Sequence, residues 1–186
     1  MANEKKEYPT QPSFVGQKVY LRAETVDDAK RHLEWFNKSE PQSMTVHPLE
    51  FTCETDIIDR FKKMEKSPYK QAFAIILSED DTHIGKVSFF NYNDVNRSAE
   101  LGILVDPLFR QLDFGKEALQ LLISFLFDFR NLNKVYAETA EFNTPTVHLL
   151  ESLGFHKDGT LRQHHYFNGE YYGKFVYSLI RFEKDW

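Results

Sequence analysis

The hydrophobic pattern of this chain changes its period near the middle. Before the change, three short apolar runs separated by polar turns occupy residues 72–77, 83–90 and 99–105, which predicts an antiparallel meander of strands. After the change, a long stretch of helical spacing leads into a strand at 134–139 and a short helix at 144–153. A meander followed by helix–strand alternation predicts a single domain of the α+β class.

Short signals mark the ends of several predicted elements. Thr25 with Asp28 three residues later resembles a capping box, which predicts that a helix begins there, directly after a strand at 18–22. Gly154 is the expected stop of the short helix before it, because glycine readily adopts left-handed backbone angles. The last predicted strand covers 175–180 and follows a polar, aromatic hairpin.

The longest predicted helix comes after Asp106-Pro107, a pair that should end the strand at 99–105. Its apolar residues keep the spacing i, i+3, i+4, i+7, i+8, i+11, which corresponds to one broad apolar face. These residues are Ala118, Leu121, Leu122, Phe125, Leu126 and Phe129.

A length of 186 residues suits one domain. Residues 1–12 are polar and contain almost nothing that a core could bury, so we expect a disordered tail followed by one domain at 13–186. No apolar run approaches the ~20 residues of a membrane span, which predicts a soluble, cytoplasmic protein.

Composition excludes several classes of site. The chain has 23 Lys and Arg against 28 Asp and Glu, and its net charge of −5 argues against binding to nucleic acid or to an anionic membrane. The single cysteine, Cys53, excludes a disulfide framework and a Cys-rich zinc site. The seven histidines lack HExxH or similar spacing, so no metal site is predicted.

The segment between Asp106-Pro107 and the long helix is the most informative part of the sequence. A turn that leads into a helix N-terminus presents unpaired backbone N–H groups and the positive end of the helix dipole, which suits a pyrophosphate. Alone, such a turn is also an ordinary connection between two elements.

The turn resembles the acetyl-CoA loop of the GNAT N-acetyltransferases, whose pattern is Arg/Gln-x-x-Gly-x-Gly/Ala. Arg110 holds the first position of this pattern and Gly115 the last. Downstream, Asn143-Thr144-Pro145-Thr146 resembles the family's Asn-x-x-Ser motif, and Leu153-Gly154-Phe155 resembles the Leu-Gly-Phe that ends the following helix. Several motifs in the right order are more specific than any one alone.

Segments near both ends of the chain narrow the resemblance to a subgroup. Leu21-Arg22 and residues 34–37, together with 159–164 and 168–171, are similar to the subgroup that includes ribosomal-protein N-terminal, spermidine and amino-sugar N-acetyltransferases. The resemblance implies a GNAT domain with a central mixed, mostly antiparallel sheet flanked by helices. It also implies direct transfer of an acetyl group from acetyl-CoA to a primary amine, without a metal.

The resemblance implies which residues bind acetyl-CoA. Backbone N–H groups near Leu104 and Val105 would hold the thioester carbonyl, and the turn at 112–116 would hold the pyrophosphate. Asn143 would bond the pantetheine, or cap the helix that starts beside it. The expected residues of the turn are Arg110, Leu112, Asp113, Phe114, Gly115 and Lys116.

Four side chains are candidates for the proton transfers. Glu100 matches an acidic residue that acts as the base in many relatives, and is otherwise a solvated or ion-paired strand residue. Thr146 replaces the Ser whose hydroxyl bonds the CoA sulfur, and otherwise satisfies the backbone of its own helix. His164 and His165 are alternative bases or packed hairpin residues, and strand alternation points their rings to opposite faces.

The sequence departs from the family at three positions. Asp113 stands where the loop pattern has glycine; Asp tolerates left-handed angles, but a carboxylate ~5 Å from a phosphate charge costs about 3 kcal/mol at an effective dielectric of ~20. Leu150 replaces a Tyr of many members, and Gly173 an Asp of the subgroup. These departures favour the alternative of a catalytically degenerate GNAT-fold protein that serves as a binding or oligomerisation module. A nucleotide or sugar-nucleotide would also suit the turn.

The acceptor amine stays open at this level. A polyamine, an amino sugar, an aminoglycoside-like antibiotic and a protein N-terminus all fit, and the negative net charge suits a cationic acceptor without selecting one. Three alternative roles suit the aromatic residues of the C-terminal hairpin: lining of an acceptor pocket, packing within the sheet, or contact at the edge of a dimer. A homodimer is expected, partly because the family often dimerises.

Overall fold

The computed structural model describes residues 14–37, 50–65 and 67–186, so the tail expected at 1–12 lies outside the described residues. Eight strands form one sheet in the order β1-β2-β3-β4-β5-β6-β8-β7. All neighbouring strands are antiparallel except β5 and β6, which confirms the expected mixed, mostly antiparallel sheet. The strands are β1 (Phe14–Val15), β2 (Val19–Ala23), β3 (Gln71–Leu77), β4 (His83–Asn93), β5 (Ser98–Val105), β6 (Lys134–Ala140), β7 (His156–Phe167) and β8 (Glu170–Ile180).

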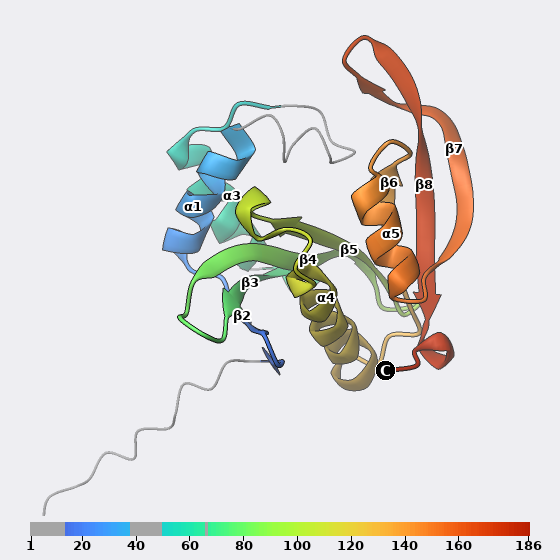
Figure 1. Cartoon of the computed structure of the whole chain (residues 1–186), viewed down its shortest axis with the longest axis horizontal. Helices are drawn as coiled ribbons and strands as arrows, with labels where there is room; N and C mark the ends of the chain where they lie inside the picture. Colours follow the sequence, from blue (N-terminus) through green and yellow to red (C-terminus); the bar gives the residue numbers. More distant parts are fainter. Residues whose placement is uncertain (1–13, 38–49, 66) are drawn as a thin grey trace, which may run out of the picture.

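Helices cover both faces of the sheet (Figure 1). Helices α4 and α5 pack on one face, and α1 with α3 lies on the other. The described α-helices are α1 (Val26–Asn37), α3 (Glu54–Glu65), α4 (Phe114–Ser124) and α5 (Thr144–Ser152). None of the helices described has the length and apolar character that crossing a membrane requires.

Strand alternation divides the apolar residues between two cores. Val87, Leu101 and Leu122 belong to the main core, which fills the space between the sheet and α4. On the opposite face, the small Ala72 and Ala74 of β3 are buried outside this cluster. Helices α1 and α3 cover this face: they contact each other, α3 contacts β3, and the ring of His32 on α1 lies 5.4 Å from that of His83 on β4.

The predicted helix ends are confirmed where a side chain caps the backbone. The Thr25 N–H donates to Asp28 Oδ2 at 2.8 Å, and the Asp28 N–H donates to Thr25 Oγ1 at 3.3 Å, so the capping box is present. Gly154 follows α5 with φ +77°, the left-handed conformation expected of a helix stop.

The apolar face predicted for the long helix is wrong at its C-terminal end. A π-helical turn occupies Phe125–Phe129, and the Arg130 N–H donates to Phe125 O at 3.1 Å, five residues back. The wider turn shifts the helical register, so Phe127 is fully buried at 0% exposure, whereas Phe129 is 77% exposed.

The C-terminal hairpin is longer than the sequence predicted. Strands β7 and β8 join at Asn168-Gly169, both with positive φ, and extend beyond the rest of the sheet (Figure 1). An Asn-Gly pair between two strands is the usual signal for such a two-residue turn. A register shift between Leu161 and His165, with Gln163 at φ +49°, bends the outer strand.

The π-helical turn generates a paired stability prediction. Phe127→Ala should lower the free energy of unfolding by about 3–5 kcal/mol, because it leaves a cavity in the main core. Phe129→Ala should change it by no more than about 0.5 kcal/mol, since that ring is exposed. Urea unfolding followed by circular dichroism measures both. The reverse order would mean that the helix keeps regular spacing through Phe129.

Candidate functional site

Strands β5 and β6 are paired for only part of their length. The parallel pairing runs from Ser98 opposite Lys134 to Glu100 opposite Tyr136. Both strands continue beyond this point without pairing to each other, and β6 remains paired to β8 as far as Ala140. Glu100 and Tyr136 therefore mark the place where the two strands separate.

Backbone alternation shows which amides of β5 face this separation. The Asp106 N–H donates to Ile84 O on β4 at 2.9 Å, so the amide of Leu104, two residues earlier, also faces β4. The amides of Ile103 and Val105 face the opposite side, from which β6 has moved away. Of the two residues expected to offer an amide to a thioester carbonyl, the geometry favours Val105.

Side chains within the turn after β5 fix its path. The Leu108 N–H donates to Asp106 Oδ1 at 3.0 Å and starts the short 3-10 helix Pro107–Phe109. Arg110 Nε then donates to Val105 O at 3.1 Å, which satisfies a carbonyl that β6 does not reach. The first residue of the expected acetyl-CoA loop thus holds the loop against the end of β5.

Asp113 occupies the N-cap of α4 in the left-handed conformation, with φ 66° and ψ 2°. The turn therefore accommodates Asp where the family pattern has glycine, as the sequence predicts. The Glu117 N–H donates to Asp113 O at 3.1 Å, so the N–H groups of residues 114–116 precede the helical ladder. The Asp113 side chain is exposed and caps none of them.

Gly115 keeps α4 close to β5. A Cβ at this position would lie 3.2 Å from Ile103 Cδ1 and 3.5 Å from Val105 Cγ2. Phe114 packs against the main core, while Leu112 is exposed. The N–H groups of residues 114–116 and the ammonium of Lys116 suit a bound phosphate. The carboxylate of Asp113 does not, because it repels the negative charge of a phosphate.

Glu100 is a buried carboxylate at the point where the strands separate, with 8% exposure. Asn91 Nδ2 donates to Glu100 Oε2 at 2.8 Å. Burial raises the pKa of Glu100 above its ordinary value, and the nearby Glu138 raises it further, whereas Asn91 and Lys174 lower it. Glu138 and Lys174 form their own ion pair at 2.5 Å.

Asn143 and Thr146 meet at the start of α5. The Thr146 N–H donates to Asn143 Oδ1 at 3.3 Å, so the expected helix cap is confirmed, while no contact here tests a bond to pantetheine. Thr146 is half-buried in the first turn. Leu150 is buried in the main core, which is consistent with the absence of a proton donor at that position.

The two candidate histidines lie far along the hairpin from Glu100. His164 is exposed and His165 is 6% exposed, as strand alternation predicts. His165 lies opposite Tyr172 on β8, whereas the row of Glu100 and Tyr136 meets β8 at Ser178. Six residues of strand separate these rows by ~20 Å along β8. The structure does not bring the histidines and Glu100 together.

His165 instead belongs to an aromatic cluster. Its ring lies 5.7 Å from Phe142 and 6.4 Å from Phe167, with Phe167 nearly parallel to it. Tyr172 packs edge-on against Phe142 at 4.8 Å. At the tip of the hairpin, the rings of Tyr166 and Tyr171 are exposed and 5.1 Å apart.

A buried group of ionisable side chains beneath α1 was missed by the sequence reasoning. Arg22 donates to both carboxylate oxygens of Asp28, which also lies 3.4 Å from His83. Glu24 and His32 lie 3.3 Å apart and are almost fully buried. Burial raises the pKa of Glu24 and lowers that of His32 to about 2.

One contact joins α1 to the turn after β5. Trp35 Nε1 donates to Asp106 Oδ2 at 3.3 Å, and the other oxygen of Asp106 caps the 3-10 helix.

The sequence reasoning also missed the residues around Glu100, namely Asn91, Tyr136 and Lys174. Aligning the first residues of the predicted strands, 99 and 134, would have placed Val135 opposite Glu100, so the register that pairs Glu100 with Tyr136 came only from the structure.

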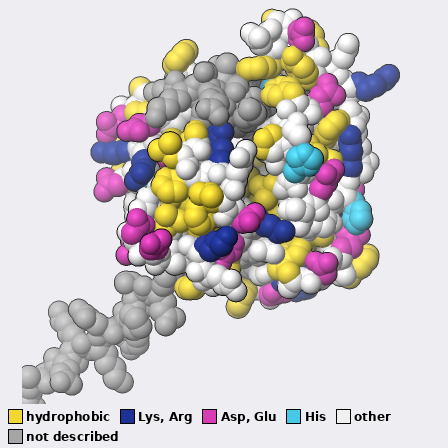
Figure 2. Space-filling model, viewed as in Figure 1, with side chains coloured by type: hydrophobic (Ala, Val, Ile, Leu, Met, Phe, Trp, Pro, Cys, Tyr) yellow, Lys and Arg dark blue, Asp and Glu magenta, His cyan; other side chains and the backbone are white. Residues whose placement is uncertain are grey.

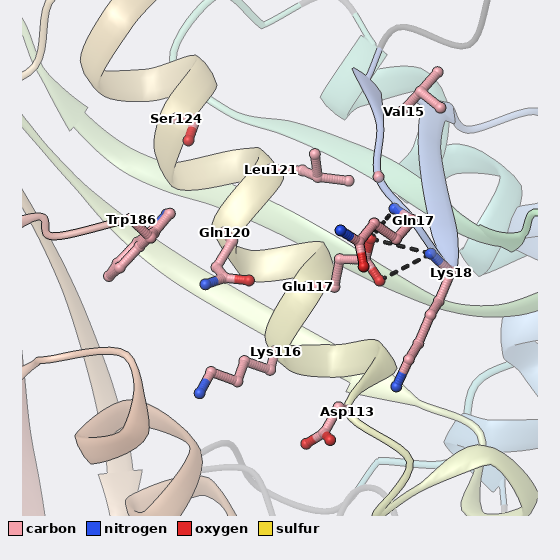
Figure 3. Close-up of a pocket in the computed structure, with 11 residues that line it drawn as sticks. Val15, Gln17, Lys18, Asp113, Lys116, Glu117, Gln120, Leu121, Ser124 and Trp186 are labelled. Atoms are coloured by element: carbon pink, nitrogen blue, oxygen red, sulfur yellow. Dashed lines mark hydrogen bonds between the residues drawn. The ribbon is translucent and has the colours of Figure 1, made fainter.

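A hollow of about 670 Å³ lies on the outer side of α4, between that helix and the turn after β1 (Figure 3). Lys18, Asp113 and Lys116 contribute charged groups to its lining. The face shown in Figure 2 carries basic and acidic side chains side by side rather than a continuous basic surface. Among the described residues, no three His, Cys, Asp or Glu side chains are grouped closely enough to hold a metal ion.

Removing either of the two charged neighbours of Glu100 should shift its pKa, in opposite directions for the two residues. Glu138→Gln should lower the pKa of Glu100, because it removes a repelling carboxylate and leaves Lys174 unpaired nearby. Lys174→Met should raise it. Carbon-13 NMR titration of the glutamate side chains measures both shifts, with Glu151→Gln on α5 as a control that should leave Glu100 unchanged. Shifts of equal sign in the two variants would contradict the assignment of these neighbours.

Comparison with known proteins agrees with this geometry. Residues 18–156 match the family model of the acetyltransferase (GNAT) domain. The uncharacterized N-acetyltransferase p20 of Bacillus licheniformis is 28% identical over 169 residues, which cover 90% of this chain and 95% of that protein. The spermidine N(1)-acetyltransferase of Vibrio cholerae is 33% identical over 88 residues, which cover 47% of this chain and 51% of that protein.

Solved structures share the fold. The spermidine N-acetyltransferase of Vibrio cholerae in complex with CoA and spermine has a TM-score of 0.85 at 22% identity, covering 90% of this chain and 98% of that one. RimL, a ribosomal-protein α-N-acetyltransferase in complex with coenzyme A, has a TM-score of 0.80 at 19% identity, covering 89% and 96%. This chain belongs to the GNAT acetyltransferase family.

Proposed function

We propose that this protein transfers an acetyl group from acetyl-CoA directly to a primary amine of a small molecule or a protein N-terminus. The observation that carries the proposal is Glu100, a buried carboxylate of raised pKa where β5 and β6 separate. The CoA complexes of the structural neighbours support acetyl-CoA as the cosubstrate. We also retain the expectations of a cytoplasmic location and a homodimer.

The proposed binding mode uses backbone groups on both sides of the turn. The N–H groups of residues 114–116 and the side chain of Lys116 bind the pyrophosphate at the N-terminus of α4. The amide of Val105 donates to the thioester carbonyl, where negative charge develops as the amine attacks. Asn143 keeps its capping bond, and its side-chain amide bonds the pantetheine.

The proposed chemistry gives Glu100 the role of general base. Amines are mostly protonated at neutral pH, so attack requires that a proton leave the nitrogen. In its ionised form Glu100 accepts this proton directly or through water, and the raised pKa makes it a better base than an exposed carboxylate. Thr146, in the first turn of α5, is assigned the role of donor to the departing sulfur. His164 and His165, on β7 toward the tip of the hairpin, lie too far from Glu100 to share this step.

Calorimetric titration with CoA and acetyl-CoA, without an acceptor, tests the cofactor half of the proposal. Micromolar binding supports it, and an amine screen with thiol detection then identifies the acceptor. The acceptors for comparison are a polyamine, an amino sugar, an aminoglycoside and a peptide with a free N-terminus. An absence of binding at millimolar CoA would refute the proposal and favour a degenerate binding module.

Glu100→Gln should lower kcat by about 10²–10⁴-fold, because the amide cannot accept the proton. Its CoA affinity should stay close to that of the wild type. In the wild type, kcat/KM should fall as pH drops through the raised pKa of Glu100, since the protonated carboxyl is inactive. Initial rates against pH measure this acid limb, which should disappear in the variant. A retained acid limb in Glu100→Gln would assign the base elsewhere.

Substitution of Asp113 separates its charge from its backbone strain. Asp113→Asn removes the carboxylate but tolerates the left-handed angles, and Asp113→Gly removes both the charge and the Cβ. Because the carboxylate is exposed and screened, each variant should bind CoA about tenfold more tightly than the wild type. Calorimetry measures the affinities. Tightening in the Gly variant alone would attribute the weaker binding to strain.

A further inference from the structure

We infer that the turn between β1 and β2 is a clamp on the acetyl-CoA turn, in which Glu117 and Lys18 are positioning residues for CoA binding. The inference rests on the proposed function, because it concerns how the same turn is held. It follows from contacts between segments that are about a hundred residues apart in the sequence (Figure 3).

Glu117 reaches from the first turn of α4 to the backbone of the clamp. Its Oε1 accepts a hydrogen bond from the Gln17 N–H, and the Lys18 N–H donates to Oε1 and Oε2, each at 3.1 Å. A carboxylate that accepts two backbone N–H groups is a charge-assisted contact, stronger than a bond between neutral groups. The contact therefore fixes the first turn of α4 against the turn that leads into β2.

Gly16 makes this contact possible. A Cβ on residue 16 would lie 2.1 Å from Glu117 Oε1 and 2.9 Å from Val19 O, closer than real Cβ atoms approach. The Gly16 N–H also donates to Val19 O at 2.8 Å, which closes the turn. Absence of a side chain at residue 16 is thus required by the carboxylate that arrives from α4.

Lys18 holds the other side of the acetyl-CoA turn. Its Nζ donates to Leu112 O at 3.4 Å, immediately before Asp113. Arg110 holds the start of the turn through Val105 O, so the segment 111–113 is fixed at both ends. This matters because Gln111 and Asp113 both have positive φ, a conformation that non-glycine residues keep only when their surroundings impose it.

The clamp also acts on charge. Lys18 and Lys116 line the same hollow as Asp113, on either side of it in Figure 3. The two ammonium groups of this hollow attract a phosphate, whereas its two carboxylates, Asp113 and Glu117, repel one. Lys18 therefore both holds the Leu112 carbonyl and adds a positive charge to the hollow beside the acetyl-CoA turn.

Glu117→Gln and Lys18→Met test the clamp in the full chain. Glu117→Gln should raise the Kd for CoA and the KM for acetyl-CoA about tenfold, with kcat at saturation unchanged, because the catalytic groups are untouched. Lys18→Met, which keeps the length of the stem, should raise both by a smaller factor. Glu54→Gln in the first turn of α3 is the matched control and should change neither.

A readout without ligand separates positioning from general stability. In the apo protein, Glu117→Gln should speed hydrogen exchange at Gln17, Lys18 and residues 114–117, and leave the amides of β3 and β4 unaffected. Gly16→Ala should reproduce the loss of CoA affinity in the wild-type background. In the Glu117→Ala background its added effect should be smaller, since the collision with the carboxylate is gone and only the close approach to Val19 O remains.

The outcomes separate the proposed function from the clamp. If the wild type fails to bind CoA, the proposed function is refuted and the clamp has no cofactor to position. If the wild type binds CoA and Glu117→Gln binds it equally, the clamp alone is refuted. A fall in kcat or in global exchange protection with unchanged KM would also refute it, because that result describes a structural contact only.

Discussion

The separation of β5 from β6 is the constraint on which the rest of the structure depends. Strand β6 pairs with β8 along its whole length but with β5 only from Ser98 to Glu100, so the sheet behaves as two sheets joined at one short parallel contact. Asp106-Pro107 ends β5. The Arg110 side chain donates a hydrogen bond to the Val105 carbonyl, which would bond to β6 if the parallel pairing were longer. The separation leaves the amides of Ile103 and Val105 and the N-terminus of α4 on the same side. Buried Glu100 lies at the junction itself.

The features predicted from sequence are those that depend on neighbouring residues. The Thr25–Asp28 capping box, the Asn143 cap and the left-handed Gly154 each need only a few consecutive residues, and all are present. Asp113 is also left-handed, a conformation that the sequence analysis expected an Asp to tolerate at this position of the family pattern. Likewise the order of strands and helices followed from the period of the hydrophobic pattern.

Features that depend on distant residues were beyond the reach of the sequence. The π-helical turn places Phe127 rather than Phe129 in the core, and the Arg181 guanidinium, which donates to Phe127 O, comes from the far end of the chain. The contact of Glu117 with the turn at Gly16 joins segments that no local pattern connects. The placement of His165 away from Glu100 follows from the length of a hairpin whose start was not predicted. In each case packing between remote segments decided the outcome.

Ionisable groups on the α1 face restrict the conditions under which both fold and site function. His32 is kept neutral by burial, whereas the unfolded chain protonates it near 6.5, so its contribution to stability is complete above that pH and is lost as pH falls toward its folded pKa of about 2. Burial alone would raise the pKa of Asp28, but its bonds from Arg22 hold it well below the ordinary value, and this contribution is also lost in acid. The contribution of Glu24 to stability has the opposite dependence on pH, because its raised pKa favours the folded state at low pH. Glu100 accepts a proton only in its ionised form, at pH values above its raised pKa. His32 and Asp28 therefore stabilise the fold at neutral and alkaline pH, and the proposed base is active in the same direction, where an amine is also most readily deprotonated.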